Sequence, residues 1–377
     1  MKIRHIIAYR VKSILHLNHS LHDDWLGKIA DGLMIIGPNG SGKSTLLEGL
    51  AALWEAWGEW LDAAQTGRLN VVGGELGRRE PANLGKEFPL FDQPNFGLLA
   101  MELVDLEPRR PVWLAAGGRD EVAGLKRQQP DAYVVAAIGQ RRDEARRLGD
   151  WALDWPGAPR DMSWLARWAE GRRRALLGVE ELPNLLYFEP DNRQLLAPRD
   201  GLDMTRDLQD PPLHHWIARY EPTARRAGHL GSMLYRMQIT DPEALKAILA
   251  DINAYLRGKR LENFAPSGDL EVAIHEPGGE QAIKHPVYEL SSGERQVFIM
   301  VAMLRRWLHR GGLVLIDEPD LHLHPSLRGA LLARLRRIVA EQEGQLLITS
   351  QSERLWKDFT RPAERIELGE QAEVREE

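Results

Sequence analysis

The sequence predicts an α/β fold whose core is a mostly parallel sheet. Strand-like and helix-like patterns alternate in residues 1–60 and 285–370, which is typical of strand–helix–strand units. A glycine-rich loop follows one apolar strand pattern and two carboxylates follow another, so the ends of two strands carry polar groups. We also expect an antiparallel β subdomain and an inserted helical lobe, because the long middle section interrupts the core without a linker rich in Gly, Pro or Ser.

The individual elements follow from the spacing of apolar residues. Strands are expected at residues 1–9, 13–22, 32–36, 185–188, 314–316, 346–349 and 365–368. Helices are expected at residues 43–63, 294–309, 326–341 and 352–358, with mostly helical segments at 141–177 and 200–295 and a hairpin of residues 269–275 and 281–287. Three further strands, at residues 97–105, 111–116 and 132–138, are expected to form an antiparallel meander.

The composition excludes several classes of protein. The chain has 377 residues, of which 43% are apolar, and this is enough for a sizeable core. The net charge of −6 does not favour a general nucleic-acid binder, and the absence of cysteine excludes a disulfide framework, a thiolate zinc site and a cysteine nucleophile. No apolar run approaches the ~20 residues of a membrane span, and no signal core follows residues 1–5. We therefore expect a cytoplasmic protein without a membrane partner.

Residues 37–45 match the phosphate-loop pattern G-x-x-x-x-G-K-[ST] in full. Glycines allow backbone N–H groups to turn toward an anion, and the following helix points its positive end at the same place. We expect Lys43 to reach the β- and γ-phosphates of ATP and the Ser44 hydroxyl to coordinate Mg²⁺. The alternative is a glycine-rich turn that matches by chance, but the flanking strand and helix patterns favour a phosphate site. The expected nucleotide-binding residues of this loop are Asn39, Gly40, Ser41, Gly42, Lys43, Ser44 and Thr45.

An apolar run at residues 313–316 ends in Asp317 and Glu318. In a phosphate-loop site, Asp317 is expected to hold the Mg²⁺ shell, directly or through water. Glu318 points elsewhere in an extended chain and is expected to polarise the attacking water. Alone, the pair reads equally well as a solvated acidic turn; beside an intact phosphate loop it favours a catalytic role.

Residues 289–296, Glu-Leu-Ser-Ser-Gly-Glu-Arg-Gln, open a predicted helix. Ser291 followed by Glu294 fits a helix-capping box, which is the structural alternative. The segment also resembles the signature of ABC ATPases as it occurs in RecF- and SMC-like proteins, and residues 289–296 are called the signature segment below. That resemblance implies that Ser291, Gly293 and Glu294 contact the γ-phosphate of ATP held by a second copy of the chain, so that ATP joins a head-to-head dimer.

Residues 317–325, Asp-Glu-Pro-Asp-Leu-His-Leu-His-Pro, resemble ATPases of the OLD (overcoming lysogenization defect) type. The resemblance places this loop at the dimer interface. A metal role for His322 and His324 is the alternative, but no third ligand is visible in the sequence. The family carries a γ-phosphate-contacting His where this chain has Gln351. Because Gln can hydrogen-bond but cannot carry a proton, we expect ATP hydrolysis to be slow.

Two further likenesses are weaker. Tyr9-Arg10 resembles an aromatic–Arg pair of the family, in which Arg10 would approach the nucleotide; a surface Arg at a strand end is the alternative. Residues 187–193 resemble the family's strand before the signature lobe and serve as a marker of topology only. The segment 141–174 is rich in Arg and Trp and fits either a nucleic-acid or partner surface or, as we favour, a solvated helical face.

The resemblance also divides the chain into four segments. Residues 1–105 form the first part of the ATPase core with the phosphate loop, 106–184 an inserted β and helical region, 185–288 a core strand with the helical signature lobe, and 289–377 the second part of the core.

The implied function is an ATP-dependent dimeric switch. OLD proteins carry a nuclease domain after the ATPase, whereas this chain stops soon after its last expected strand, so we expect a separate nuclease or toxin as effector, in bacterial anti-phage defence. A RecF-like DNA-repair ATPase is the alternative. The long gap between Gly37 and Ser291 speaks against a transporter subunit.

Overall fold

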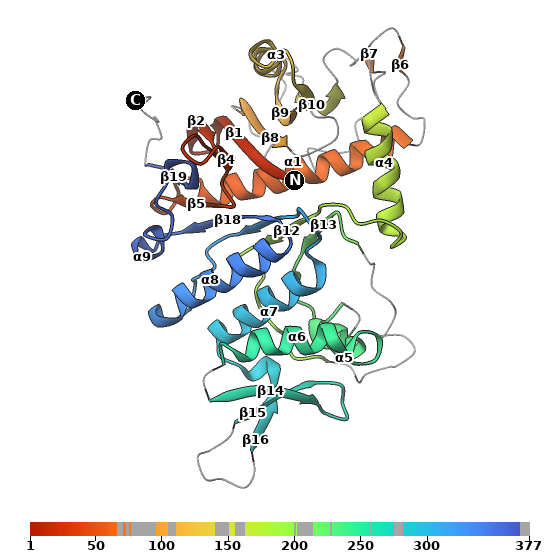
Figure 1. Cartoon of the computed structure of the whole chain (residues 1–377), viewed down its shortest axis with the longest axis vertical. Coiled ribbons are helices and arrows are strands. Elements are labelled where there is room, and N and C mark those ends of the chain that lie inside the picture. The colour runs from red at the N-terminus through yellow and green to blue at the C-terminus, as the bar shows by residue number, and fades with distance from the viewer. Residues whose placement is uncertain are drawn as a thin grey trace.

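The computed structural model describes residues 1–65, 71–72, 75–76, 96–104, 111–139, 151–154, 163–199, 201, 214–226, 228–256, 258–274 and 282–369. The molecule is elongated, with one sheet and α3 at one end and a small β arm at the other (Figure 1). Of the helices in these ranges, none combines the length and apolarity that a bilayer span requires.

The core is a six-stranded sheet in the order β13-β12-β17-β18-β5-β19, and every neighbouring pair in it is parallel. The expected parallel α/β core is therefore confirmed. Because polar groups that follow parallel strands gather at one edge, the order places the end of β18 between the ends of β17 and β5. The strands are β5 (Gly32–Ile36), β12 (Leu185–Phe188), β13 (Ile217–Arg219), β17 (Leu313–Ile316), β18 (Gln345–Ser350) and β19 (Arg365–Glu367).

Helices cover both faces of this sheet, and strand alternation decides which residue meets which helix. In β5, Leu33 and Ile35 pack with α1, whereas Met34 and Ile36 pack with α7 and α8. The entirely buried pattern of β5 follows from this double cover. These helices and the short one that follows β18 are α1 (Lys43–Gln65), α7 (Ser292–Trp307), α8 (Pro325–Glu341) and α9 (Glu353–Trp356).

A second six-stranded sheet lies over α1 in the order β11-β10-β9-β8-β1-β2. Its pairs are antiparallel except β9–β10, which is parallel, so the predicted meander is wrong at its third strand. The reason is α3 (Arg119–Gln128), which returns the chain to the starting edge before β10. The strands are β1 (Lys2–Val11), β2 (Ile14–Ser20), β8 (Leu98–Val104), β9 (Val112–Gly118), β10 (Tyr133–Gly139) and β11 (Trp151–Asp154).

The predicted helical segment 141–177 is only partly helical. Residues 151–154 form β11, and the helix α4 spans Ser163–Leu176. Arg141, Arg142, Arg146, Arg147 and Trp155 lie outside the described residues.

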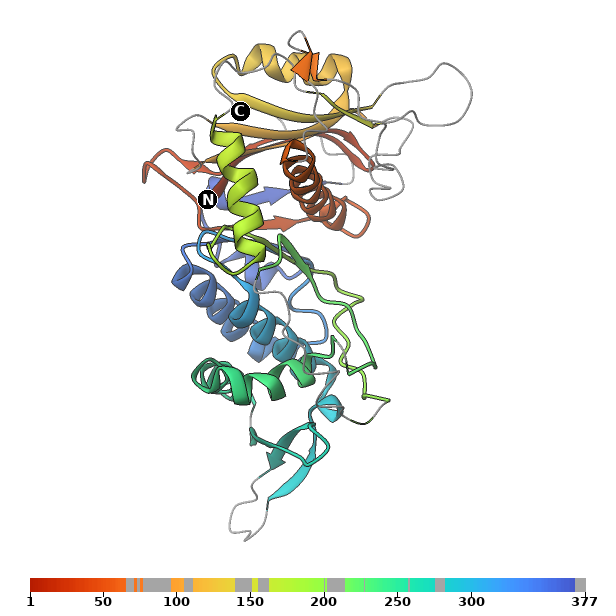
Figure 2. The ribbon, with the colours of Figure 1, turned by 90° about the vertical axis from the view of Figure 1, so that its right-hand side faces the viewer.

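The helical lobe carries a three-stranded antiparallel arm at the far end of the molecule (Figure 2). The expected hairpin is β15–β16, and β14 joins it as a third strand. The elements are α5 (Leu230–Thr240), α6 (Pro242–Asn253), β14 (Lys259–Phe264), β15 (Leu270–Ile274), β16 (Ile283–Pro286) and the 3-10 turn Val287–Glu289. Smaller elements are β3 (His22–Asp23), β4 (Lys28–Ile29), β6 (Val71–Val72), β7 (Glu75–Leu76) and the turn Pro362–Glu364.

One buried glutamine joins the two large sheets. Gln345 is fully buried at the start of β18. Its Oε1 accepts from the Ile3 N–H at 2.8 Å, and its Nε2 donates to the carbonyls of Ile3 at 3.0 Å and Ala30 at 2.9 Å. The side chain therefore satisfies three buried main-chain groups of the N-terminal segment.

Four tryptophans, Trp54, Trp57, Trp168 and Trp216, form a cluster that fastens α1 to α4 and to the segment before β13. The indole N–H groups of Trp54 and Trp216 each donate to the other residue's carbonyl at 2.8 Å. In the described part of the Arg- and Trp-rich segment, Trp168 thus packs inward, while Arg173 and Arg174 form surface ion pairs with Glu170 and Glu180. In these residues the arrangement is that of a solvated helical face, which is the interpretation favoured for the segment 141–174.

The Trp cluster leaves no room beside Gly58. A Cβ there would lie 2.5 Å from the Arg172 Nη1 and the Trp216 Nε1, whereas nothing lies within 4 Å of one at Gly124 in α3. We expect Gly58→Ala to lower the free energy of unfolding by about 1–2 kcal/mol, because overpacking outweighs the helical preference for Ala. The matched Gly124→Ala should raise it by up to about 1 kcal/mol. Urea denaturation measures both, and equal effects would contradict the packing argument.

Candidate nucleotide-binding site

The phosphate loop connects β5 to α1, as predicted, and its glycines are required by their surroundings. Gly42 has φ +98°, and a Cβ there would lie 2.7 Å from the Ile14 Cγ1 and 2.9 Å from the Ser13 Oγ. A Cβ at Gly37 would lie 2.2 Å from the Leu368 carbonyl oxygen. The turn between β1 and β2 and the end of β19 thus hold the loop from two sides, and no larger residue fits at either position.

Lys43 lies inside the loop at the first position of α1. Its side chain is 5% exposed, and Nζ donates to the carbonyls of Gly37 and Pro38 at 2.9 Å each. Burial lowers the pKa of the Lys43 ammonium, while the carboxylates of Glu318 and Asp317 act in the opposite direction. The parallel pairing of β18 with β17 and with β5 brings the acidic strand end and the phosphate loop to one edge of the sheet, although Asp317 lies 274 positions after Lys43.

The other hydroxyls of the loop differ in exposure. Ser44 is exposed and Thr45 is partly buried. The Oγ of Ser41 is buried and makes no hydrogen bond among the described residues. A buried hydroxyl without a hydrogen-bond partner, in a loop that leads into the N-terminus of α1, fits a site that is completed by a ligand.

The end of β18 connects the two halves of the acidic pair. The Thr349 hydroxyl donates to the Asp317 carboxylate and accepts the Glu318 N–H at 2.9 Å. The Gln351 amide donates to the Glu318 carboxylate at 2.6 Å. Asp317 is 1% exposed, whereas Glu318 is partly buried and Gln351 is exposed. Glu318 and Gln351, two residues that the sequence analysis assigns to the site separately, are therefore brought together, with Thr349 as a hydrogen-bonding partner that the sequence did not indicate.

Glu318 has an unusual backbone conformation. Its φ is +47°, in the left-handed region that non-glycine residues rarely adopt. The guanidinium of Arg193 donates to the Glu318 carbonyl at 2.9 Å. Asp320 follows on the same turn, where it accepts from the Ser350 hydroxyl at 2.9 Å and lies 3.6 Å from Arg328. The carboxylates of the loop are thus held by polar groups from several elements.

The signature segment forms the predicted capping box at the start of α7. Ser291 is the N-cap; its N–H and Oγ donate to the Glu294 carboxylate at 2.9 and 2.8 Å, and Glu294 N–H donates back to Oγ at 3.4 Å. Lys259 of β14 donates to the same carboxylate at 3.0 Å. Burial raises the pKa of Glu294, but these hydrogen bonds outweigh it and hold the pKa below its usual value.

The signature segment also faces solvent. Glu289, Ser291 and Ser292 are exposed, whereas Leu290, Gly293 and Gln296 are buried. A Cβ at Gly293 would lie 3.0 Å from the His322 carbonyl oxygen, so the signature segment packs on the loop of residues 317–325. The N-terminus of α7 therefore carries a capping box and is still accessible to solvent.

The structure places Arg10 beside the Tyr9 ring and leaves both histidines of the loop exposed. The Arg10 guanidinium lies 5.0 Å from the centre of the Tyr9 ring, and its approach to a nucleotide stays a prediction. His322 and His324 are exposed, and no group of three or more potential metal ligands of the His, Cys, Asp or Glu type occurs within the described ranges.

The donor set of the site fits Mg²⁺ and a nucleoside triphosphate. Ser44 offers a hydroxyl and Asp317 a carboxylate, which are hard oxygen ligands of the kind that Mg²⁺ prefers. Lys43, the backbone of the loop and the N-terminus of α1 offer positive charge to phosphates. Sequence reasoning missed Arg193, Thr349 and Lys259, because each belongs to a segment that reaches the site only through the fold.

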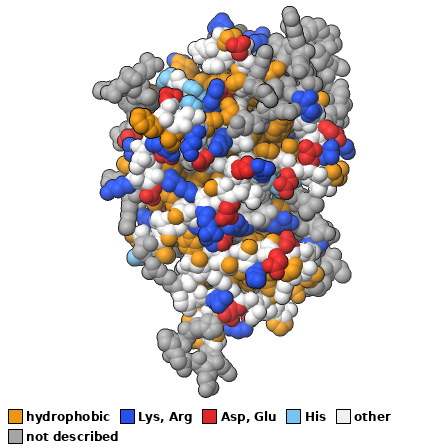
Figure 3. All heavy atoms as spheres, in the orientation of Figure 1, with side chains coloured by type: hydrophobic (Ala, Val, Ile, Leu, Met, Phe, Trp, Pro, Cys, Tyr) orange, Lys and Arg blue, Asp and Glu red, His pale blue; other side chains and the backbone are white. Residues whose placement is uncertain are grey.

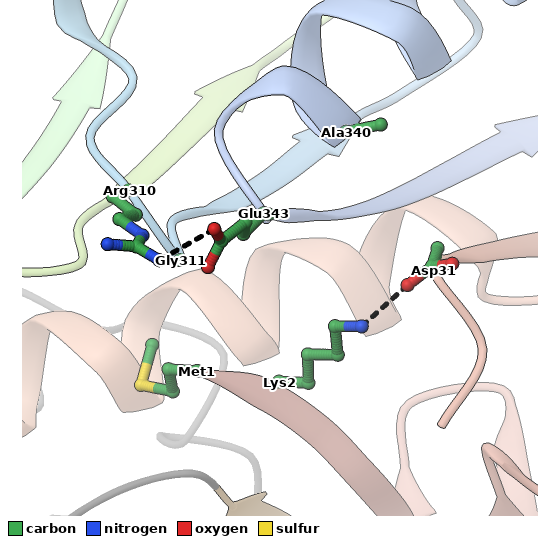
Figure 4. Close-up of a pocket in the computed structure, with 8 residues that line it drawn as sticks. Met1, Lys2, Asp31, Arg310, Gly311, Ala340 and Glu343 are labelled. Carbon is green, nitrogen blue, oxygen red and sulfur yellow. Dashed lines mark hydrogen bonds and ion pairs between the residues drawn. The ribbon is translucent and has the colours of Figure 1, made fainter. Parts of the chain in front are cut away.

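A cavity of about 600 Å³ lies at the opposite edge of the core sheet (Figure 4). Its four charged side chains form two ion pairs, Lys2–Asp31 at 2.5 Å and Arg310–Glu343 at 2.6 Å. Because these charges satisfy each other, the cavity is a weaker candidate for an anion than the phosphate loop. On the face in Figure 3, basic and acidic side chains are interspersed, without a continuous basic field.

Comparisons with known proteins find one family model and several solved structures to which the chain is similar. A family model described as "AAA domain, putative AbiEii toxin, Type IV TA system" matches residues 166–355, which is half of the chain. Among curated proteins, none matches. Solved structures that match include the SMC head domain from Thermotoga maritima, 13% identical, covering 98% of this chain and 94% of that one with a TM-score of 0.40. The Smc head domain with an extended coiled coil from Pyrococcus furiosus, bound to the C-terminal domain of ScpA, is 13% identical, covering 94% and 91% with a TM-score of 0.38.

Proposed function

The chain belongs to the family of AAA domains described as "putative AbiEii toxin, Type IV TA system", and we propose from this that it is an ATP-hydrolysing switch that dimerises head to head on ATP. The observation that carries the proposal is the parallel order β17-β18-β5, which brings the acidic strand end and the phosphate loop to the same edge of the core sheet. It supports a single site built from the phosphate loop and the acidic strand end, as phosphoryl transfer from ATP to water requires.

In this proposal each polar group has one task. The phosphate loop and Lys43 bind the phosphates, and Lys43 exchanges its two carbonyl partners for phosphate oxygens. Ser44 and Asp317 would hold Mg²⁺, which would neutralise phosphate charge when bound. Glu318 accepts the proton of the attacking water, and Gln351 orients the Glu318 carboxylate through its hydrogen bond. Gln351 cannot itself receive a proton, and this supports slow turnover.

Dimerisation is supported by what the signature segment leaves accessible. Ser291 and Ser292 are exposed at the N-terminus of α7, where N–H groups and the helix dipole favour an anion. Among the described residues, the hydrogen bonds of Ser291 go to Glu294 and Arg295 of its own helix. A second copy is the natural source of the phosphate that this terminus would bind.

The description of the family suggests the biological setting. We propose that the ATP-bound dimer controls a separate nuclease or toxin, in bacterial defence against phage. The four-segment division of the chain and a cytoplasmic location are proposed on the same basis. Duplex DNA binding that depends on ATP and falls steeply with salt would instead favour a repair ATPase.

A mixing experiment tests the shared sites directly. Lys43→Ala removes phosphate binding, and Ser291→Arg blocks the signature segment, so each variant alone should lose nearly all ATPase activity. In a mixed dimer, the phosphate loop of the Ser291→Arg chain meets the intact signature segment of the Lys43→Ala chain. An equal mixture should therefore recover about a quarter of the wild-type rate, because half of the dimers have one working site of two.

A second mixture is the negative control for sites shared between two chains. Mixing Lys43→Ala with Asp317→Asn, which impair the same half of the site, should recover nothing. Failure of the first mixture to exceed the sum of its parts, with both proteins folded, would exclude sites shared between two chains.

A further inference from the structure

The segment after β12 brings a buried arginine to the acidic strand end. Arg193 is 3% exposed, and its Nη2 donates to the main-chain oxygen of Glu318 at 2.9 Å. Its Nε and Nη1 are buried as well and have no hydrogen-bond partner among the described residues. The charged guanidinium of Arg193 is thus buried while only one of its three nitrogens makes a hydrogen bond among the described residues.

Stability alone does not explain this arginine. Burial lowers the pKa of Arg193 to about 10, while Asp317, Glu318, Asp320 and Asp191 act in the opposite direction. The side chain therefore stays charged at neutral pH. A buried cation with unsatisfied donors is often no more stabilising than an apolar residue of similar volume, so its presence points to a task in the site.

The hydrogen bonds around Glu318 indicate what that task is. Its N–H is held by Thr349 and its carboxylate by Gln351, and both of these residues belong to β18 or its end. The carbonyl accepts a hydrogen bond from Arg193, which lies in the segment that follows β12, the strand on the other side of β17. Because φ is +47°, which is costly for a residue with a side chain, the conformation persists only if the surroundings enforce it.

We infer that Arg193 is a positioning residue: by gripping the Glu318 carbonyl it holds the strained turn and so aims the Glu318 carboxylate at the attacking water. The inference rests on the proposed function of Glu318. It assigns to residues 187–193 a role beyond marking the topology.

Arg193→Met and Arg193→Lys test the inference. With Met, which has a similar length but no donor, kcat for ATP should fall by about 100-fold, the scale of a misplaced reacting group. KM for ATP should change by less than about 3-fold, because the phosphate loop is untouched. The melting temperature should stay the same or rise. Lys keeps the charge and a donor for the carbonyl, so it should restore part of kcat. Arg310→Met, at the opposite edge of the sheet, is the matched control and should leave kcat and KM unchanged.

Three results would overturn the inference: an unchanged kcat in Arg193→Met, an equal rise in KM, or a fall in melting temperature that accounts for the lost activity. A crystal structure of Arg193→Met gives a readout independent of activity, since residue 318 should leave the left-handed region; a φ still positive would refute the role of Arg193. If the wild type hydrolyses no ATP, the proposed function fails. The φ of residue 318 in Arg193→Met then still tests whether Arg193 holds the turn.

Discussion

Glu318→Gln is expected to stop ATP turnover and to trap an ATP-bound dimer. The substitution keeps the shape of the side chain and a carbonyl oxygen that can still accept the Gln351 amide, but it removes the base. We expect kcat to fall by about 10²–10³-fold, which is the usual contribution of general-base catalysis. ATP affinity should remain, since Lys43 and the phosphate loop are unaltered.

Light scattering measures the trapped state. With ATP and Mg²⁺ the variant should move from the monomer mass of 42.7 kDa to twice that value, and chromatography should recover ATP with it. The double variant Lys43→Ala, Glu318→Gln is the control and should remain monomeric. A Glu318→Gln protein that binds ATP but keeps the monomer mass would contradict the proposed dimer.

Gln345→Leu is expected to give the largest loss of stability. Leucine fits the volume of the site but leaves the N–H and C=O of Ile3 and the C=O of Ala30 unpaired in the core. Each unsatisfied buried group costs about 1–3 kcal/mol, so the free energy of unfolding should fall by about 3–5 kcal/mol. Urea denaturation of the nucleotide-free protein measures the difference.

The exposed Gln238 on α5 provides the control for this substitution. Gln238→Leu should change the free energy of unfolding by less than about 0.5 kcal/mol. If Gln345→Leu had an equally small effect, water or local rearrangement would have to satisfy the three main-chain groups, and the join between the sheets would not depend on this side chain.

The sequence predicts best those features that are encoded by neighbouring residues. The phosphate loop, the acidic pair and the capping box are contiguous, so their local chemistry can be interpreted without a fold. The burial of β5 on both faces was visible as a short apolar run for the same reason. The roles of these residues in binding and hydrolysis stay proposals until they are measured.

Features that depend on distant segments were not predictable in the same way. Arg193 reaches Glu318 only because β12 pairs with β17, and no local pattern announces that pairing. The parallel pairing of β9 with β10 depends on the crossover helix α3, whose two buried residues, Val122 and Leu125, stand in a mostly polar segment. Periodicity over residues 141–177 likewise could not show that residues 151–154 pair with β10.

The position of β5 in the core sheet has a consequence for folding during synthesis on the ribosome. Its two neighbours are β18 and β19. The Ile3 N–H likewise lacks its hydrogen-bond acceptor until Gln345, which lies 342 positions later in the chain, has been synthesised. A ribosome adds about 5–20 residues each second, so the strand that carries the phosphate loop spends many seconds without either partner. Until then its apolar surface is exposed to chaperones and to other nascent chains, and ATP cannot bind a finished site before β18 and β19 have been synthesised.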